Sequence, residues 1–161
     1  MSFWGALAGG LVGTVVLTSG LRAASELGLT RMDLPFLLGT AVTANRVRAK
    51  AVGYGMHVAF GLVFAVGYWL ILSAIDESGW LAGALLGLLH GVFAATALVN
   101  VLLPLVHPRM ATPLTAAGRS PLLEAPGFLM LNYGRATPIV NLIAHAAYGA
   151  IVGGCVSLAD R

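Results

Sequence analysis

Charged side chains are scarce in this sequence, and their distribution indicates the fold class. Asp, Glu, Lys and Arg make up 9% of the 161 residues, whereas soluble proteins carry about 25%. Residues 78–108 contain none of the four, and this run of 31 residues exceeds the roughly 20 apolar residues that span a bilayer. The shortage of charge argues strongly against a soluble fold and predicts an integral membrane protein.

Cysteine and the common catalytic motifs are also nearly absent. The single cysteine, Cys155, excludes an intrachain disulfide and any cysteine-rich metal site. The sequence has no HxxxH, HExxH or CxxC spacing, no Gly-x-Ser-x-Gly elbow and no P-loop, so a multidentate metal site or a common enzyme site is not indicated. An enzyme is not expected, although a histidine-based intramembrane enzyme stays open. Without a basic helix or an aromatic platform, nucleic acid is not an expected partner.

Four uncharged apolar runs are each long enough to cross a bilayer. No Lys or Arg precedes the first run, so we interpret it as an uncleaved helix and not as a signal peptide. No Asp, Glu, Lys or Arg falls inside the four runs, which argues against a proton pump or a cation transporter. We expect an all-α polytopic membrane protein, a single domain over 1–161, with its helices in an up-down bundle. The predicted spans are 2–21, 51–75, 79–103 and 137–159.

A shorter apolar segment over 34–44 connects the first two predicted spans. Asp33 is a plausible N-cap and Pro35 suits a first helical turn. The segment is too short to cross a bilayer, so we expect an interfacial or re-entrant helix. Two interpretations remain open for this connector: a link that rests on the membrane, or a lid over a cavity.

The basic residues predict how the chain is oriented. Eight of the nine Lys and Arg residues lie in the connections 22–50 and 104–135, and the connection between the second and third spans has none. Cytoplasmic loops carry the excess of Lys and Arg. We therefore expect a bacterial cytoplasmic (inner) membrane protein with both long connections in the cytoplasm and both termini outside.

Glycine is abundant, and it recurs at four-residue spacing in two of the predicted spans. Gly5, Gly9 and Gly13 form one series. The second series consists of Gly83, Gly87 and Gly91. Such smooth faces let neighbouring helices approach closely. The partners expected are the lipid bilayer and either other membrane subunits or a second copy of the chain.

All four histidines fall in or at the edge of the predicted spans. His57 and His145 are expected at similar depth on helices that lie diagonally across the bundle, where they can form a ligand pair, and His90 lies near the middle of its span as a single axial ligand. Neutral imidazole is a common ligand for haem and metals, and its second nitrogen needs a hydrogen-bond partner. The alternative is that each histidine only bonds to another helix. Candidate partners or pathway residues are Asn141, Tyr148, Asn100 and His107, the last two on one side if their helix runs straight.

These residues support two functional interpretations and a plainer third one. The first is a small non-catalytic membrane subunit, in an electron-transfer-type complex, that holds haem or pigment through His57, His145 or His90. The second is a small transporter or channel whose pathway is lined by histidine and asparagine. The third is a scaffold protein in which the histidines only tie helices together. The identity of the ligand and of the partner is not given by the sequence.

Overall fold

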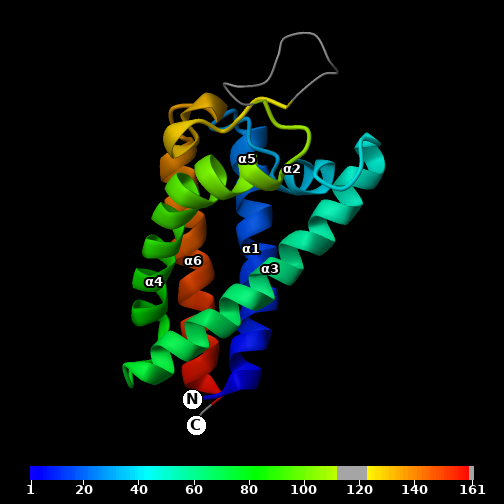
Figure 1. Ribbon diagram of the computed structural model, residues 1–161. Helices are drawn as coiled ribbons and strands as arrows, with labels where there is room; N and C mark the ends of the chain where they lie inside the picture. Colours follow the sequence, from blue (N-terminus) through cyan, green and yellow to red (C-terminus); the bar gives the residue numbers. More distant parts are fainter. Residues whose placement is uncertain (112–122, 160–161) are drawn as a thin grey trace.

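The computed structural model describes residues 1–111 and 123–159, and in this part of the chain the regular structure is helical. Four helices, one of them the continuous segment Trp80–Val106, are long and apolar enough to cross a membrane. This confirms the expectation of an all-helical chain with four such helices (Figure 1). The elements are α1 (Phe3–Glu26), α2 (Leu34–Thr40), α3 (Arg46–Ala74), α4 (Trp80–Phe93), the π-helical η1 (Ala94–Leu102), α5 (Leu103–Val106), the 3-10 helix η2 (Phe128–Tyr133) and α6 (Thr137–Leu158).

Side-chain caps fix where three of the helices begin. The hydroxyl of Ser2 accepts a hydrogen bond from the Gly5 N–H at 3.0 Å, and Asn45 caps α3 in the same way at 3.0 Å. Asp33 caps α2 by accepting from the Phe36 N–H at 3.1 Å, with proline in the first turn. Such caps satisfy backbone donors that have no partner inside the helix. The sequence therefore identified the start of α2 correctly.

Helices α1 and α3 extend further than the apolar runs that predict them. α1 continues past Leu21 to Glu26, and the Arg22 side chain forms an ion pair with Glu26 at 2.9 Å. α3 begins at Arg46, five residues before its apolar run. Both extensions point toward the end of the molecule that holds α2 and η2, opposite the two termini (Figure 1). Both helices therefore continue through polar residues beyond their apolar runs.

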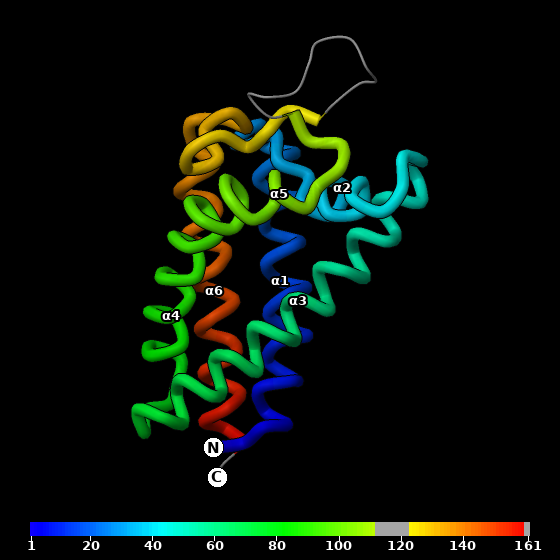
Figure 2. Tube along the Cα trace, viewed as in Figure 1, coloured from blue at the N-terminus to red at the C-terminus, as the bar shows by residue number. Residues whose placement is uncertain are grey.

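Helix α6 packs against both α1 and α4, and glycine makes both contacts close (Figure 2). A Cβ atom added at Gly83 would overlap the carbonyl oxygen of Gly149, and one added at Gly149 would overlap that of Gly83. Cβ atoms at Gly5 and Gly9 would meet the α6 backbone. Both glycine series are therefore occupied within the chain. They no longer support an interface with another subunit, and the expected membrane partner stays a prediction.

Helix α3 runs obliquely across the other helices (Figures 1 and 2). It contacts α1 where Gly61 meets the Thr14 side chain. Toward its N-terminus it packs instead on α2, since a Cβ atom at Gly53 would overlap the Pro35 carbonyl and one at Gly39 would overlap the Ala49 carbonyl. Figure 1 shows that this course takes α3 away from α4 toward the end of the molecule that holds α2.

The third long helix does not run straight. After α4 the backbone becomes π-helical in η1, and the Asn100 side chain donates to the Ala95 carbonyl five residues earlier, at 2.8 Å. A π-helical segment adds residues per turn and so rotates the side chains that follow it. α5 then runs across the end of the bundle (Figure 1). Pro104 lies in its first turn.

The segment before α6 is held against the loop that follows α1. The Arg31 guanidinium forms an ion pair with Glu124 at 3.2 Å and donates to the Asn132 carbonyl. The phenol of Tyr133 donates to the Glu124 carbonyl at 2.7 Å, and burial, together with the nearby Glu124 carboxylate, raises the pKa of Tyr133 to about 12. These contacts position Met130, which reaches the cavity described next.

Candidate functional site

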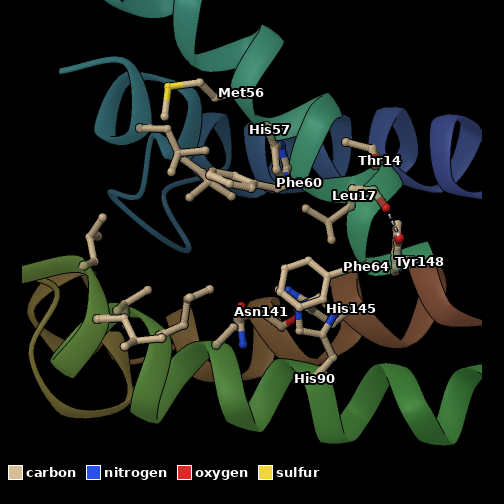
Figure 3. Close-up of a pocket in the computed structure, with 18 of the residues that line it drawn as sticks. Thr14, Leu17, Met56, His57, Phe60, Phe64, His90, Asn141, His145 and Tyr148 are labelled. Carbon is tan, nitrogen blue, oxygen red and sulfur yellow. Dashed lines mark hydrogen bonds between the residues drawn. The ribbon is translucent and has the colours of Figure 1, made fainter. Parts of the chain in front are cut away.

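A cavity of about 360 Å³ lies between α1, α3, α6 and the α4–η1–α5 segment, with α2 at one end. Pockets that hold small molecules usually measure about 300–1,000 Å³ and are mostly apolar with a few polar groups. Most of this lining is aliphatic or aromatic, and no Lys, Arg, Asp or Glu contributes to it among the described residues. The polar side chains in the lining are Thr14, His57, His90, Asn141, His145 and Tyr148 (Figure 3).

Three of the four histidines are therefore brought to one cavity from three different helices. His57 comes from α3, His90 from α4 and His145 from α6. Figure 3 shows His57 on one wall, with His90, His145 and Asn141 on the opposite wall. The rings of His90 and His145 are in edge contact, with centroids 4.7 Å apart. No described carboxylate pairs with these rings, and a buried unpaired imidazolium is costly, so we treat them as neutral.

The hydrogen bonds of His145 fix which of its nitrogens carries the proton. Nδ1 lies 2.9 Å from the Asn141 carbonyl oxygen, one turn earlier on the same helix. A carbonyl only accepts, so Nδ1–H is the donor. The Nε2 atom then has a free lone pair, and no described residue donates to it. His145 thus has the arrangement of a histidine ligand, in which a backbone carbonyl orients the ring through the nitrogen that does not bind.

His57 has the same tautomer for a different reason. The Thr18 hydroxyl donates to the Thr14 carbonyl at 2.6 Å and lies 2.9 Å from Nδ1 of His57. Because that hydroxyl has one proton, His57 Nδ1–H donates to Thr18 Oγ1. His57 Nε2 is left as an acceptor without a partner in the described chain. This bond also ties α3 to α1.

His90 is held by aromatic rings and takes the other tautomer. Its ring lies on Phe64, with centroids 4.0 Å apart and an interplanar angle of 35°. The Tyr68 hydroxyl lies 3.3 Å from His90 Nδ1 and has no other acceptor among the residues described. The phenol therefore donates to Nδ1, and His90 Nε2 carries the proton.

Asn141 supplies a buried acceptor that the protein does not satisfy. Its side chain is 1% exposed, and its Nδ2 donates to the Gly91 carbonyl on α4 at 2.8 Å. Its Oδ1 is buried and has no hydrogen-bond partner. An unsatisfied buried polar atom costs about 1–3 kcal/mol and calls for an explanation such as a bound molecule. Asn141 lines the cavity, but Oδ1 itself has almost no accessible surface, so a partner in the cavity reaches it only when the side chain moves.

The other predicted residues have structural roles in the described chain. Tyr148 donates to the Gly61 carbonyl at 2.5 Å, which ties α6 to α3. His107 has left the helix: Nε2 lies 3.0 Å from the Leu37 carbonyl, and Nδ1 accepts from the Arg109 N–H. Asn100 bonds to its own helix and is not part of the cavity lining. Asn100 and His107 were expected on one side only if their helix runs straight, and this condition is not met because of η1 and the end of α5 at Val106.

The connector α2 lines one end of the cavity. Leu34 and Leu38 of this helix contribute to the lining. Its C-terminus is capped from across the chain, since Arg109 donates to the Thr40 carbonyl at 2.6 Å. At its N-terminus, Lys50 forms an ion pair with Asp33 at 3.1 Å. The helix is seven residues long, ending at Thr40 and not at residue 44.

The site does not resemble a metal centre. Within residues 1–111 and 123–159, no group of three or more His, Cys, Asp or Glu side chains is arranged to hold a metal ion. The lining also lacks the basic side chains that would pair with the two carboxylates of a haem. What the arrangement offers is an apolar volume with hydrogen-bonding groups at the histidine end.

Comparison with family models, curated proteins and solved structures gives no match to this chain. The function is therefore argued from the cavity alone.

Proposed function

We propose that this protein is a small non-catalytic integral membrane subunit that holds a lipid-soluble ligand in the cavity between its helices. The single observation that carries the proposal is the combination of an apolar volume of about 360 Å³ with three histidines and an unsatisfied Asn141 Oδ1. A cavity that served only packing would not be expected to leave a buried amide oxygen unpaired. The proposed setting is an electron-transfer-type complex in a bacterial cytoplasmic membrane.

Among the ligands expected from the sequence, haem is supported least. An axial histidine is available at His145, whose Nδ1–H is fixed on a carbonyl. The carboxylates of a haem would have no basic partner in the lining. A neutral, lipid-soluble molecule avoids this desolvation cost. We therefore propose a neutral ligand, with haem or another pigment as an outcome of the test below.

The first experiment identifies the ligand on protein purified gently in a mild detergent. An ultraviolet–visible spectrum before and after dithionite detects haem or pigment, and organic extraction with mass spectrometry detects a colourless lipid-soluble ligand. We expect no Soret band and one dominant extracted species that is depleted in an Asn141→Leu protein. A matched Asn100→Leu protein, altered at an asparagine outside the lining, should retain it. Extraction of only bulk phospholipid from every protein would contradict the proposal.

The alternative function is a transporter or channel, and the distribution of polar groups argues against it. A water-filled pathway needs polar groups along its length, whereas the lining near α2, η1 and α5 is apolar in the described residues. Asn100, one of its expected lining residues, lies outside the cavity. Flux in proteoliposomes that depended on His57 and His145 would favour this alternative over ligand storage.

The proposed orientation has an up-down bundle with α2 and the long basic connections in the cytoplasm and both termini outside. We expect an impermeant maleimide to label Ser78→Cys in intact cells, and Ala44→Cys only after lysis, both in a Cys155→Ser background. Ser78 and Ala44 are both exposed, and they lie beyond opposite ends of α3, which should cross the membrane. The reverse labelling pattern would invert the orientation, and labelling of both sites in intact cells would contradict the crossing.

A further inference from the structure

We infer that the cavity binds its ligand through a hydroxyl group, which identifies the ligand class as a lipid-soluble hydroquinone or a long-chain alcohol. This inference rests on the proposed function and specifies the chemistry of the same site. It comes from the direction of the hydrogen bonds around the cavity and not from its volume.

The histidine end of the cavity is rich in acceptors. His145 and His57 each donate Nδ1–H to a neighbouring oxygen. Each therefore has an unprotonated Nε2 with no partner in the described residues. The side-chain amide of Asn141 donates to the Gly91 carbonyl, and its Oδ1 is a third acceptor without a partner. A ligand hydroxyl has one proton and satisfies one of these acceptors, whereas a ligand that only accepts satisfies none of them.

One donor accompanies these acceptors. Tyr68 donates to Nδ1 of His90, so the Nε2–H of that ring remains available. The rings of His90 and His145 are in contact, with centroids 4.7 Å apart. A hydroxyl suits such a set because it donates one hydrogen bond and accepts others. A quinone carbonyl or an ether oxygen only accepts, and would leave the free acceptors unsatisfied.

The rest of the lining suits an apolar body attached to that hydroxyl. Leu34 and Leu38 of α2 lie at one end, and Leu102, Leu103 and Val106 come from η1 and α5. Burial of hydrocarbon against these side chains contributes affinity without direction, so the hydroxyl sets the selectivity. The two sources of a hydroxyl, an aromatic hydroquinone and an aliphatic alcohol, share this chemistry.

The test measures binding of five probes to the full-length protein in lipid nanodiscs. The probes are decylhydroquinone kept reduced with dithionite, its dimethyl ether, the parent benzoquinone, farnesol and farnesyl methyl ether. We expect each hydroxyl compound to bind at least about tenfold more tightly than its methyl ether, because the ether leaves buried acceptors unpaired. The hydroquinone should likewise bind more tightly than the benzoquinone. Tighter binding of decylhydroquinone indicates an aromatic ligand, and tighter binding of farnesol indicates an aliphatic one.

Two variants separate the polar contact from general packing. Asn141→Leu and His57→Phe remove acceptors from the cavity, and each should reduce the preference for the hydroxyl compound. Asn100→Leu, altered outside the lining, should keep the full preference. The probe series with the unaltered protein decides the question even if a variant fails to fold.

The possible results are distinct. Equal binding of hydroxyl compounds and ethers, or tighter binding of the benzoquinone, would overturn the hydroxyl inference while leaving the proposed function in place. Binding of none of the five probes would overturn both. A preference for hydroxyl compounds that disappears in Asn141→Leu and persists in Asn100→Leu would support both.

Discussion

Replacing Gly83 with alanine is expected to lower the thermal midpoint of the purified protein by about 2–12 °C. The added Cβ atom would overlap the carbonyl oxygen of Gly149, a backbone atom that cannot turn aside. Overpacking of this kind costs about 1–3 kcal/mol or more, and each kcal/mol corresponds to about 2–4 °C in a chain of this size. Light-scattering or fluorescence melts in detergent would measure the shift.

The matched control is Gly67→Ala on α3, where an added Cβ atom meets nothing within 4 Å. Alanine is the better helix former by roughly 1 kcal/mol, so this control should be neutral or slightly stabilising. Gly149→Ala should be as harmful as Gly83→Ala. The double variant should lose less than the sum, because both changes separate the same two helices. Equal midpoints for Gly83→Ala and Gly67→Ala would contradict the observed packing of α4 on α6.

Replacing Leu98 with tryptophan is expected to remove the bound ligand, with at least a tenfold loss of affinity. Leu98 lies in η1, lines the cavity and packs against the buried core. The indole is larger than the leucine side chain and would occupy volume that the ligand needs. Native mass spectrometry, or quantitative extraction of the ligand per chain, would measure the loss.

Val101→Trp is the control for this experiment. Val101 follows Leu98 by three residues in the same π-helical segment, but it is 54% exposed and does not line the cavity. The two variants therefore add the same bulky side chain to η1, at a position that lines the cavity in one protein and at an exposed position in the other. Ligand lost from Leu98→Trp and retained in Val101→Trp supports the cavity as the binding site. Equal retention in both proteins would place the ligand elsewhere.

The sequence predicted the parts of the fold that depend on local composition. Uncharged runs predicted the four long helices, and Asp33 followed by Pro35 predicted the start of α2. The glycine series at Gly83 predicted a close helix contact, although the contacting helix was not identifiable from spacing. Each of these predictions depends only on residues that are close together in the sequence.

The features that the sequence did not predict arise from tertiary packing. Nothing in the hydrophobic pattern indicates that η1 is π-helical, and this change turns Asn100 onto its own backbone and away from the cavity. The oblique course of α3 follows from where Gly53 and Gly61 meet α2 and α1. Both features decide which side chains line the cavity.

The candidate site was predictable in part. The histidines were identifiable because ionisable groups in membrane spans are rare, and three of them line one cavity. Asn141 was among the candidate partners and contacts His145 through its backbone carbonyl. The partner of His57 was not identified, because Thr18 is 39 residues away in the sequence and resembles an ordinary helical threonine. Phe64, which stacks on His90, gave no signal among so many apolar residues. The unsatisfied Oδ1 of Asn141 is visible only in three dimensions.

The protonation pattern of the imidazoles is the central element of the binding site, and ¹⁵N NMR measures it directly. Protein labelled with ¹⁵N-histidine has four imidazoles, each assignable by a single substitution. We expect His57 and His145 as the Nδ1–H tautomer with Nε2 unprotonated, and His107 as the Nε2–H tautomer because its Nδ1 accepts from a backbone N–H. Nε2–H tautomers at both His57 and His145 would contradict the account, because the cavity would then present donors where the ligand is expected to donate.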